Sequence, residues 1–197
     1  MNPFFVSEQA VIKMKKFHMI LHTEFGEVVI IFRKHPFLLI KILLPIKNRK
    51  DLALALKREH AETSSSIQEA QIIAGPLKKY FKGKPPEPSF KPPWNHMNLE
   101  GLTFLQKAVL VATEDIEYGT VKSYKEIAEI TGRPGACRFV GNTLARNPFP
   151  ILIPCHRVIR SNGTYGQFGG GTDMKKALIR FESHKKTKSI PYETICG

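Results

Sequence analysis

Residues 151–159 read ILIPCHRVI and place a cysteine, a histidine and an arginine next to one another among aliphatic residues. The apolar, β-branched neighbours predict a short buried strand, in which polar side chains need partners. A thiolate is a strong nucleophile and an imidazole can take its proton, so Cys155 and His156 could carry nucleophilic chemistry. Adjacent side chains of a strand point to opposite faces. The pair would therefore need a bridging water or a departure from strand geometry. The alternative is that Cys155 is an inert hydrophobic residue of a core.

Two flanking stretches could complete such a site. GACRFVGNTLAR, residues 135–146, is rich in small residues that have weak helix propensity on balance, and Arg138 lies near its centre. Small side chains let a helix approach something narrow or flat, although close helix–helix packing explains the same composition. SNGTYGQFGGG, residues 161–171, is glycine-rich and predicts a loop with turns, and its GGG at 169–171 lacks the context of a phosphate-binding loop. The GGG predicts a close approach of the backbone to a substrate, or simply a turn.

The composition indicates a globular protein with a polyanionic partner. Thirty Lys and Arg residues against seventeen Asp and Glu residues give a net charge of +13 over 197 residues. Such a balance favours nucleic acid as partner, and the alternative is a basic protein without one. The three cysteines, Cys137, Cys155 and Cys196, form no CxxC pair. We therefore expect a reducing compartment, no disulfide framework and no metal site.

The first residues and the longest apolar run bear on localisation. MNPFFVSEQAVIKMKKF is not the pattern of a secretory signal. PFLLIKILLPI, residues 36–46, is too short to span a bilayer and carries Lys41. We expect a cytoplasmic protein, or a nuclear one in a eukaryotic host, without membrane contact.

The first part of the chain predicts a small α/β domain. Apolar runs separated by a turn at Phe25-Gly26 and a break at Pro36 predict three strands within residues 17–46. Asp51 is expected to be the N-cap of a helix that continues to His60. A second helix is expected from about Ser66 to Gly83, with an interruption or kink at Gly75-Pro76. The proline-rich residues 84–96 then predict a linker. We expect an N-terminal domain over 1–83, a linker over 84–98 and a C-terminal domain over 99–197.

The second part predicts helices. Residues 102–119 are expected to form a helix that Gly119 ends, and Ser123 with Glu126 has the spacing of a capping box. A turn at 132–134 precedes a helix over 135–147, which gives a helix-turn-helix pattern. A last helix is expected from Met174 to about Lys186. The fold class is then α+β: a small antiparallel sheet with helices, followed by a helical, winged-helix-like domain.

Several of these stretches together resemble one known family. SYKEIA (123–128), GRPGACRFVGNTLARNPFPILIPCHRVI (132–159), the glycine-rich loop and RFE (180–182) are similar to O6-alkylguanine-DNA alkyltransferases, over residues 104–182. The resemblance implies repair of duplex DNA by single, irreversible transfer of an alkyl group from guanine O6, with base flipping and without a cofactor. O4-alkylthymine is a further candidate substrate. The protein would act as a monomer.

The family's roles fall on matching positions of this chain. By resemblance, Cys155 accepts the alkyl group, His156 reaches its thiol through a water, and Glu182 orients His156. Asn147 would link the recognition helix to the active-site segment, Tyr124 would lie beside the flipped nucleotide, and Arg138 would fill the gap in the base stack. Further DNA contacts would be made by Lys125, Arg133 and Ser161, and main-chain groups of Val158 and Gly169 would hold the guanine.

Three residues depart from the pattern or add to it. Phe139 and Asn142 stand where small residues are expected, and Cys137 places a second thiol beside Arg138. Three rival functions remain. A lesion-binding protein without activity would lack the cysteine, a DNA-binding regulator would need a second DNA-binding region, and a cysteine hydrolase would take its histidine from far along the chain.

Overall fold

The computed structural model describes residues 15–63, 68, 70–84 and 91–186. Of residues 184–186 it describes only the helical backbone. The chain divides into two compact units: Met1–Phe81 with Pro93–Glu100, and Lys82–Pro92 with Gly101–Gly197. The expected linker over 84–98 stays a prediction, since residues 85–90 lie outside the described part. Cys196 and the first residues of the chain lie outside it too. None of the helices in the described ranges has the length and apolar composition that crossing a bilayer requires.

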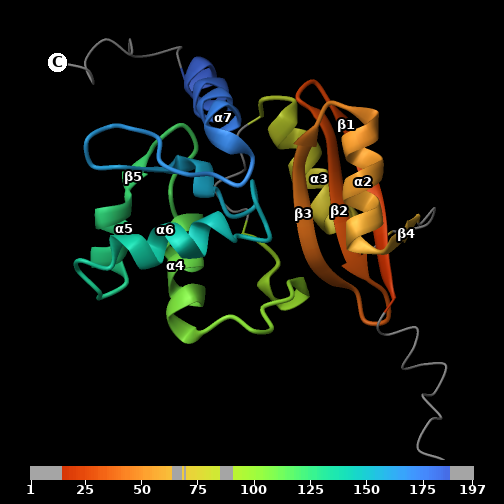
Figure 1. Ribbon diagram of the computed structural model, residues 1–197, viewed down its shortest axis with the longest axis horizontal. Helices are drawn as coiled ribbons and strands as arrows, with labels where there is room; N and C mark the ends of the chain where they lie inside the picture. The colour runs from red at the N-terminus through yellow and green to blue at the C-terminus, as the bar shows by residue number, and fades with distance from the viewer. Residues whose placement is uncertain (1–14, 64–67, 69, 85–90, 187–197) are drawn as a thin grey trace, which may run out of the picture. The chain divides into compact units, whose positions relative to one another are not determined.

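The first unit is built on a four-stranded sheet (Figure 1). Its strands are β1 (Lys16–Thr23), β2 (Gly26–Arg33), β3 (Leu38–Ile46) and β4 (Ala61–Thr63), in the order β3-β2-β1-β4. The first three strands pair antiparallel, as predicted, but β4 pairs parallel to β1. The sheet is therefore mixed and not antiparallel throughout. Three residues, Ala-Glu-Thr, are too short to show a strand period in sequence.

The core of this unit lies around β2. The side chains from Val28 to Phe32 are all buried, so both faces of the sheet are covered at this strand. The turn between β1 and β2 needs a glycine. Gly26 has φ +122°, and a Cβ there would lie 2.7 Å from the carbonyl oxygen of Ile46.

Two helices accompany the sheet, α2 (Arg49–Glu59) beside β3 and α3 (Gln71–Phe81) beside β1. The prediction that Asp51 caps α2 is wrong. Asn48 is the N-cap and accepts a hydrogen bond from the Lys50 N–H at 2.8 Å, while Asp51 lies in the first turn, where a negative charge is favourable. The sequence also predicts an interruption or kink of the second helix at Gly75-Pro76. The helix is not interrupted, because α3 continues through Pro76, and the kink stays a prediction. The short helix η1 (Trp94–His96) follows at the end of this unit.

The second unit consists of helices around a two-stranded parallel sheet (Figure 1). Its elements are α4 (Phe104–Glu114), β5 (Lys122–Ser123), α5 (Tyr124–Ile130), α6 (Cys137–Ala145), η2 (Cys155–Arg157), β6 (Val158–Ile159) and α7 (Gly171–Lys186). Helix α5 packs on α6, and both contact α4. The capping box of Ser123 and Glu126 is confirmed, with both reciprocal hydrogen bonds present. Helix α4 ends at Glu114, before the predicted Gly119, and α7 begins at Gly171, earlier than the predicted Met174.

The segment that carries Cys155 is not a strand. Cys155–Arg157 forms a turn of 3₁₀-helix, and only Val158–Ile159 is extended, in parallel pairing with β5. Just before this turn, the buried residue Ile151 has φ +73°, which is strained for a β-branched residue. The departure from strand geometry that an adjacent thiol and imidazole would need is therefore present.

Candidate active site

Cys155 is buried, and an amide holds its sulfur. The Asn147 Nδ2 group donates to the Cys155 Sγ at 3.1 Å and to the Ile153 carbonyl oxygen at 2.9 Å. The Asn147 Oδ1 accepts a hydrogen bond from the N–H of Phe149 at 3.0 Å. The Asn147 side chain is therefore hydrogen-bonded at three points of the segment 149–155. Burial raises the pKa of the Cys155 thiol, while the Asn147 hydrogen bond and the charge of Lys175 act in the opposite direction. At neutral pH the group is a thiol, and a base must take its proton.

His156 is the first member of a buried polar network. Its Nε2 lies 2.7 Å from Glu182 Oε1. Arg157 donates from Nε to Glu182 Oε2 at 2.9 Å and from a terminal nitrogen to Oε1 at 3.1 Å, and the Gly119 N–H donates to Oε2 at 2.9 Å. The carboxylate of Glu182 therefore accepts four hydrogen bonds. The other terminal nitrogen of Arg157 donates to the Ile116 carbonyl oxygen at 2.6 Å.

The charges in this network determine which nitrogen of His156 carries the proton. Burial by itself would raise the pKa of Glu182, but the hydrogen bond from His156 and the charge and hydrogen bonds of Arg157 lower it to about 2. Burial lowers the pKa of His156, so its ring is neutral at neutral pH. Because an ionised carboxylate only accepts hydrogen bonds, Nε2 must be the protonated nitrogen. This leaves Nδ1 as the basic nitrogen of the ring.

Lys175 is a site residue that sequence reasoning missed. It is fully buried on α7, and its Nζ donates to the Val158 carbonyl oxygen at 2.5 Å and to the Tyr124 Oη at 3.2 Å. Burial lowers its pKa to about 8. Lys175 lies seven residues before Glu182, and this spacing places both on one face of a helix. That periodicity was the signal in the sequence.

Tyr124 forms the first residue of α5 and lies against the glycine-rich loop. Its Oη donates to the Gln167 carbonyl oxygen at 3.3 Å, and burial raises the pKa of its phenol. Gly166 has φ +65°, and a Cβ there would lie 2.9 Å from the Tyr124 Oη. The loop glycine Gly166 therefore serves the close approach of a tyrosine ring of the same unit, and the approach of the GGG at 169–171 to a substrate stays a prediction.

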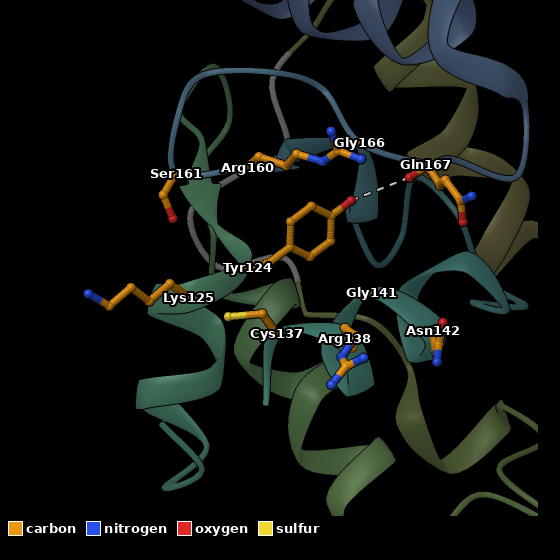
Figure 2. A pocket seen from close by; sticks show the side chains of 10 residues that line it. All are labelled: Tyr124, Lys125, Cys137, Arg138, Gly141, Asn142, Arg160, Ser161, Gly166 and Gln167. Carbon is orange, nitrogen blue, oxygen red and sulfur yellow. Dashed lines mark hydrogen bonds between the residues drawn. The ribbon is translucent and has the colours of Figure 1, made fainter. Parts of the chain in front are cut away.

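A pocket opens between α5, α6 and the loop after β6 (Figure 2). Four predicted site residues line it, namely Tyr124, Lys125, Arg138 and Ser161, together with Cys137, Gly141, Asn142, Arg160, Gly166 and Gln167. Arg133 is exposed outside the pocket, Val158 is buried behind it and Gly169 lies elsewhere on the loop. Of the three departures from the family pattern, Cys137 and Asn142 line the pocket and Phe139 does not. No three metal-ligating side chains converge anywhere in the described part of the chain.

The comparisons with known proteins agree with this geometry. The sequence profile of the family described as "6-O-methylguanine DNA methyltransferase, DNA binding domain" matches residues 104–184. Residues 104–184 belong to the O6-alkylguanine-DNA alkyltransferase family. This stretch contains Cys155, the His156–Glu182 network and every residue that lines the pocket.

Named relatives extend the match beyond the family profile. Methylated-DNA–protein-cysteine methyltransferases from Mycobacterium leprae and Homo sapiens are 40% and 36% identical over 114 and 97 residues. These alignments cover 58% and 49% of this chain, and 66% and 47% of the alkyltransferases themselves. The chain thus matches about half to two thirds of the length of these relatives.

Solved alkyltransferase structures match a larger part of the chain. The O6-methylguanine methyltransferase of Mycobacterium tuberculosis is similar with a TM-score of 0.68 at 29% identity, over 90% of this chain and 96% of that one. A structure of the enzyme from the same organism in complex with DNA has a TM-score of 0.67 at 29% identity, over 86% and 94% of the two chains. The α+β fold is therefore that of alkyltransferases.

Proposed function

We propose that this protein repairs DNA by transferring an alkyl group from O6 of guanine to the sulfur of Cys155. The observation that carries the proposal is a buried thiol, hydrogen-bonded by Asn147 and adjacent in the chain to the buried His156–Glu182 pair, within the stretch that belongs to the alkyltransferase family. A cysteine hydrolase fits less well. Its thiol and base normally come from distant parts of the chain, whereas Cys155 and His156 are neighbours.

The proposed reaction is a displacement at saturated carbon. The Cys155 Sγ attacks the alkyl carbon, an S–C bond forms, the C–O6 bond breaks, and its electron pair leaves with the guanine. The thiol proton passes through a water to Nδ1 of His156, and Tyr124 gives a proton or a hydrogen bond to the departing guanine. The thioether product has no easy hydrolytic exit. One protein molecule therefore repairs one lesion, and no cofactor takes part.

A guanine inside a duplex cannot reach a buried thiol, so the proposal includes base flipping. The base would enter the pocket beside Tyr124. Arg138 is exposed on α6, on the same pocket wall as Gly141, where its planar guanidinium can take the place of the extruded base in the stack. Helix α6 would lie in the minor groove, with Lys125, Arg133 and Ser161 as contacts to the DNA backbone.

Mass spectrometry of the intact protein after incubation with a duplex that contains O6-methylguanine tests this proposal. We expect one added methyl group in the wild type, none in Cys155→Ala, and unchanged transfer in the control variant Cys137→Ala. Cys155→Ala should still bind the duplex. Methyl transfer that survives in Cys155→Ala would contradict the assignment of the acceptor. Tight binding of the lesion by the wild type without any adduct would indicate a non-catalytic lesion binder instead.

The same assay defines the range of substrates and the working state. A duplex that contains O4-methylthymine tests whether this second base is also repaired. We propose that the protein acts as a monomer on double-stranded DNA, in the cytoplasm or, in a eukaryotic host, in the nucleus. Sedimentation of the protein with and without a short duplex checks the monomer, and a second protein copy on a minimal site would contradict it.

A further inference from the structure

Arg160 lies at the rim of the pocket and has no part in the chemistry proposed above. Its side chain is exposed and lines the pocket together with Tyr124. A turn fixes its backbone, because its N–H donates to the Thr164 carbonyl oxygen at 2.8 Å and its carbonyl oxygen accepts from the Gly163 N–H at 2.9 Å. Figure 2 shows the guanidinium extended above Tyr124 towards Gly166, on the opposite side of the ring from Arg138.

The rim of the pocket is cationic and has no carboxylate. Its lining residues include Lys125, Arg138 and Arg160 but no Asp or Glu. Lys125 has an acidic neighbour, since its Nζ lies 3.9 Å from a carboxylate oxygen of Glu129. No carboxylate of the described ranges lies within 4.0 Å of Arg160. An anion at the rim would therefore meet Arg160 without having to displace an acidic side chain.

The charge of Arg160 acts on Tyr124, which lines the pocket, and on Lys175, which is hydrogen-bonded to Tyr124. Burial raises the pKa of the Tyr124 phenol, and the charge of Arg160 opposes this shift. Burial lowers the pKa of Lys175, and the same charge lowers it further. Arg160 is thus the rim cation that acts on Tyr124, beside which the base is proposed to lie, and on Lys175, its hydrogen-bond partner, whereas neither Lys125 nor Arg138 is among the causes of these two pKa shifts.

We propose that Arg160 binds a phosphate of the nucleotide whose base enters the pocket, and that this contact holds the nucleotide for transfer. The inference rests on the proposed function, because it assumes that a guanine nucleotide occupies the pocket. A guanidinium offers a planar fork of donors that matches two phosphate oxygens. The sugar joins the base to its phosphates, so a base inside the pocket leaves a phosphate at the rim, where Arg160 lies.

Small substrates separate the phosphate from the rest of the DNA. We would measure the second-order rate constant of alkyl transfer from O6-benzylguanine, its 2′-deoxynucleoside, and the 3′- and 5′-monophosphates of that nucleoside. We expect the wild type to react roughly tenfold faster with one monophosphate than with the nucleoside, as one charge-assisted contact allows. Arg160→Ala should lose this advantage and react with the free base within about twofold of wild type. Arg160→Lys should retain part of the advantage, since it keeps the charge and loses the fork.

Arg146→Ala is the matched control, because Arg146 is an exposed arginine of the same unit that does not line the pocket and has no proposed role. It should keep the full monophosphate advantage. A wild type without any monophosphate advantage would overturn the proposal, as would an advantage that survives in Arg160→Ala. An equal loss on all four substrates would assign Arg160 to the pocket wall instead of to a phosphate. If the wild type accepts an alkyl group neither from any of the four small substrates nor from duplex DNA, the proposed function itself fails.

Discussion

Replacement of Glu182 by glutamine removes the charge that holds the buried network together. The variant keeps the shape of the side chain, but it leaves the buried Arg157 without a counter-ion and lets the ring of His156 turn. The size of the resulting loss of stability follows from the pKa of Glu182, which falls from its ordinary value of 4.5 to about 2 in the folded protein. At about 1.4 kcal/mol per pKa unit, Glu182→Gln should lower the free energy of unfolding by about 3 kcal/mol at pH 7.

The pH dependence of this loss follows from the sign of the shift. A carboxyl whose pKa is lower in the folded state stabilises the fold fully above its ordinary pKa, and the contribution disappears as the pH falls towards the folded pKa. The difference between wild type and Glu182→Gln should therefore be constant from pH 7 to about 5. It should shrink between pH 4.5 and 2. Urea denaturation at pH 7, 4 and 3 measures it, and less than about half should remain at pH 3.

The exposed carboxyl of Glu117 provides the control, since Glu117→Gln should change the free energy of unfolding by less than about 0.5 kcal/mol at each pH. The rate of alkyl transfer should fall in Glu182→Gln and not in the control, because Glu182, unlike Glu117, is hydrogen-bonded to the His156 ring. A loss of stability in Glu182→Gln that is the same at pH 7 and pH 3 would refute the reasoning, since it would come from packing and not from the charge.

Four further predictions concern the pocket and its DNA. Gly166→Ala should slow transfer, because its methyl group would meet the Tyr124 Oη at 2.9 Å; Gly163→Ala has a similar φ of +77° and no atom within 4 Å, so it should lose comparable stability in a thermal melt and keep its rate. Lys175→Met should slow transfer and should leave the melting temperature unchanged or raise it. The transfer rate of the wild type should fall above about pH 8, where Lys175 loses its charge. Arg138→Ala and Arg138→Lys should both fail on duplex DNA yet react normally with the free alkylated base, whereas equal loss on both substrates would give Arg138 a structural role. The affinity for duplex should fall steeply with salt, and a flat dependence would count against phosphate contacts.

Sequence patterns determined the elements whose causes lie within a few residues. The capping box of Ser123 and Glu126 was predictable because both hydrogen bonds close within four residues. The three long strands were predictable because each is a mostly apolar run, and a turn at Phe25-Gly26 and a break at Pro36 separate them. The motif around Cys155 was sufficient to name the family, and the comparison over residues 104–184 confirms it.

Local patterns were weaker where two residues compete or where an element is very short. Asn48 and Asp51 are both good N-caps, and only the folded backbone shows that Asn48 has the extended conformation a cap needs. The stretch ILIPCHRVI has the composition of a strand. The hydrogen bonds of the Asn147 side chain to this loop, together with Pro154, which lacks a backbone donor, accompany a 3₁₀ turn instead.

Only the tertiary structure decided how the active site is assembled. Glu182 meets His156 across 26 residues and the Gly119 N–H across 63, and Lys175 meets Tyr124 across 51. No local period or spacing encodes such contacts, because they depend on how α7 packs against η2. Burial supplies the remaining reason. The same lysine and glutamate at a surface would stay near their ordinary pKa values. In the protein interior water is excluded, so burial and the neighbouring charges and hydrogen bonds determine these pKa values.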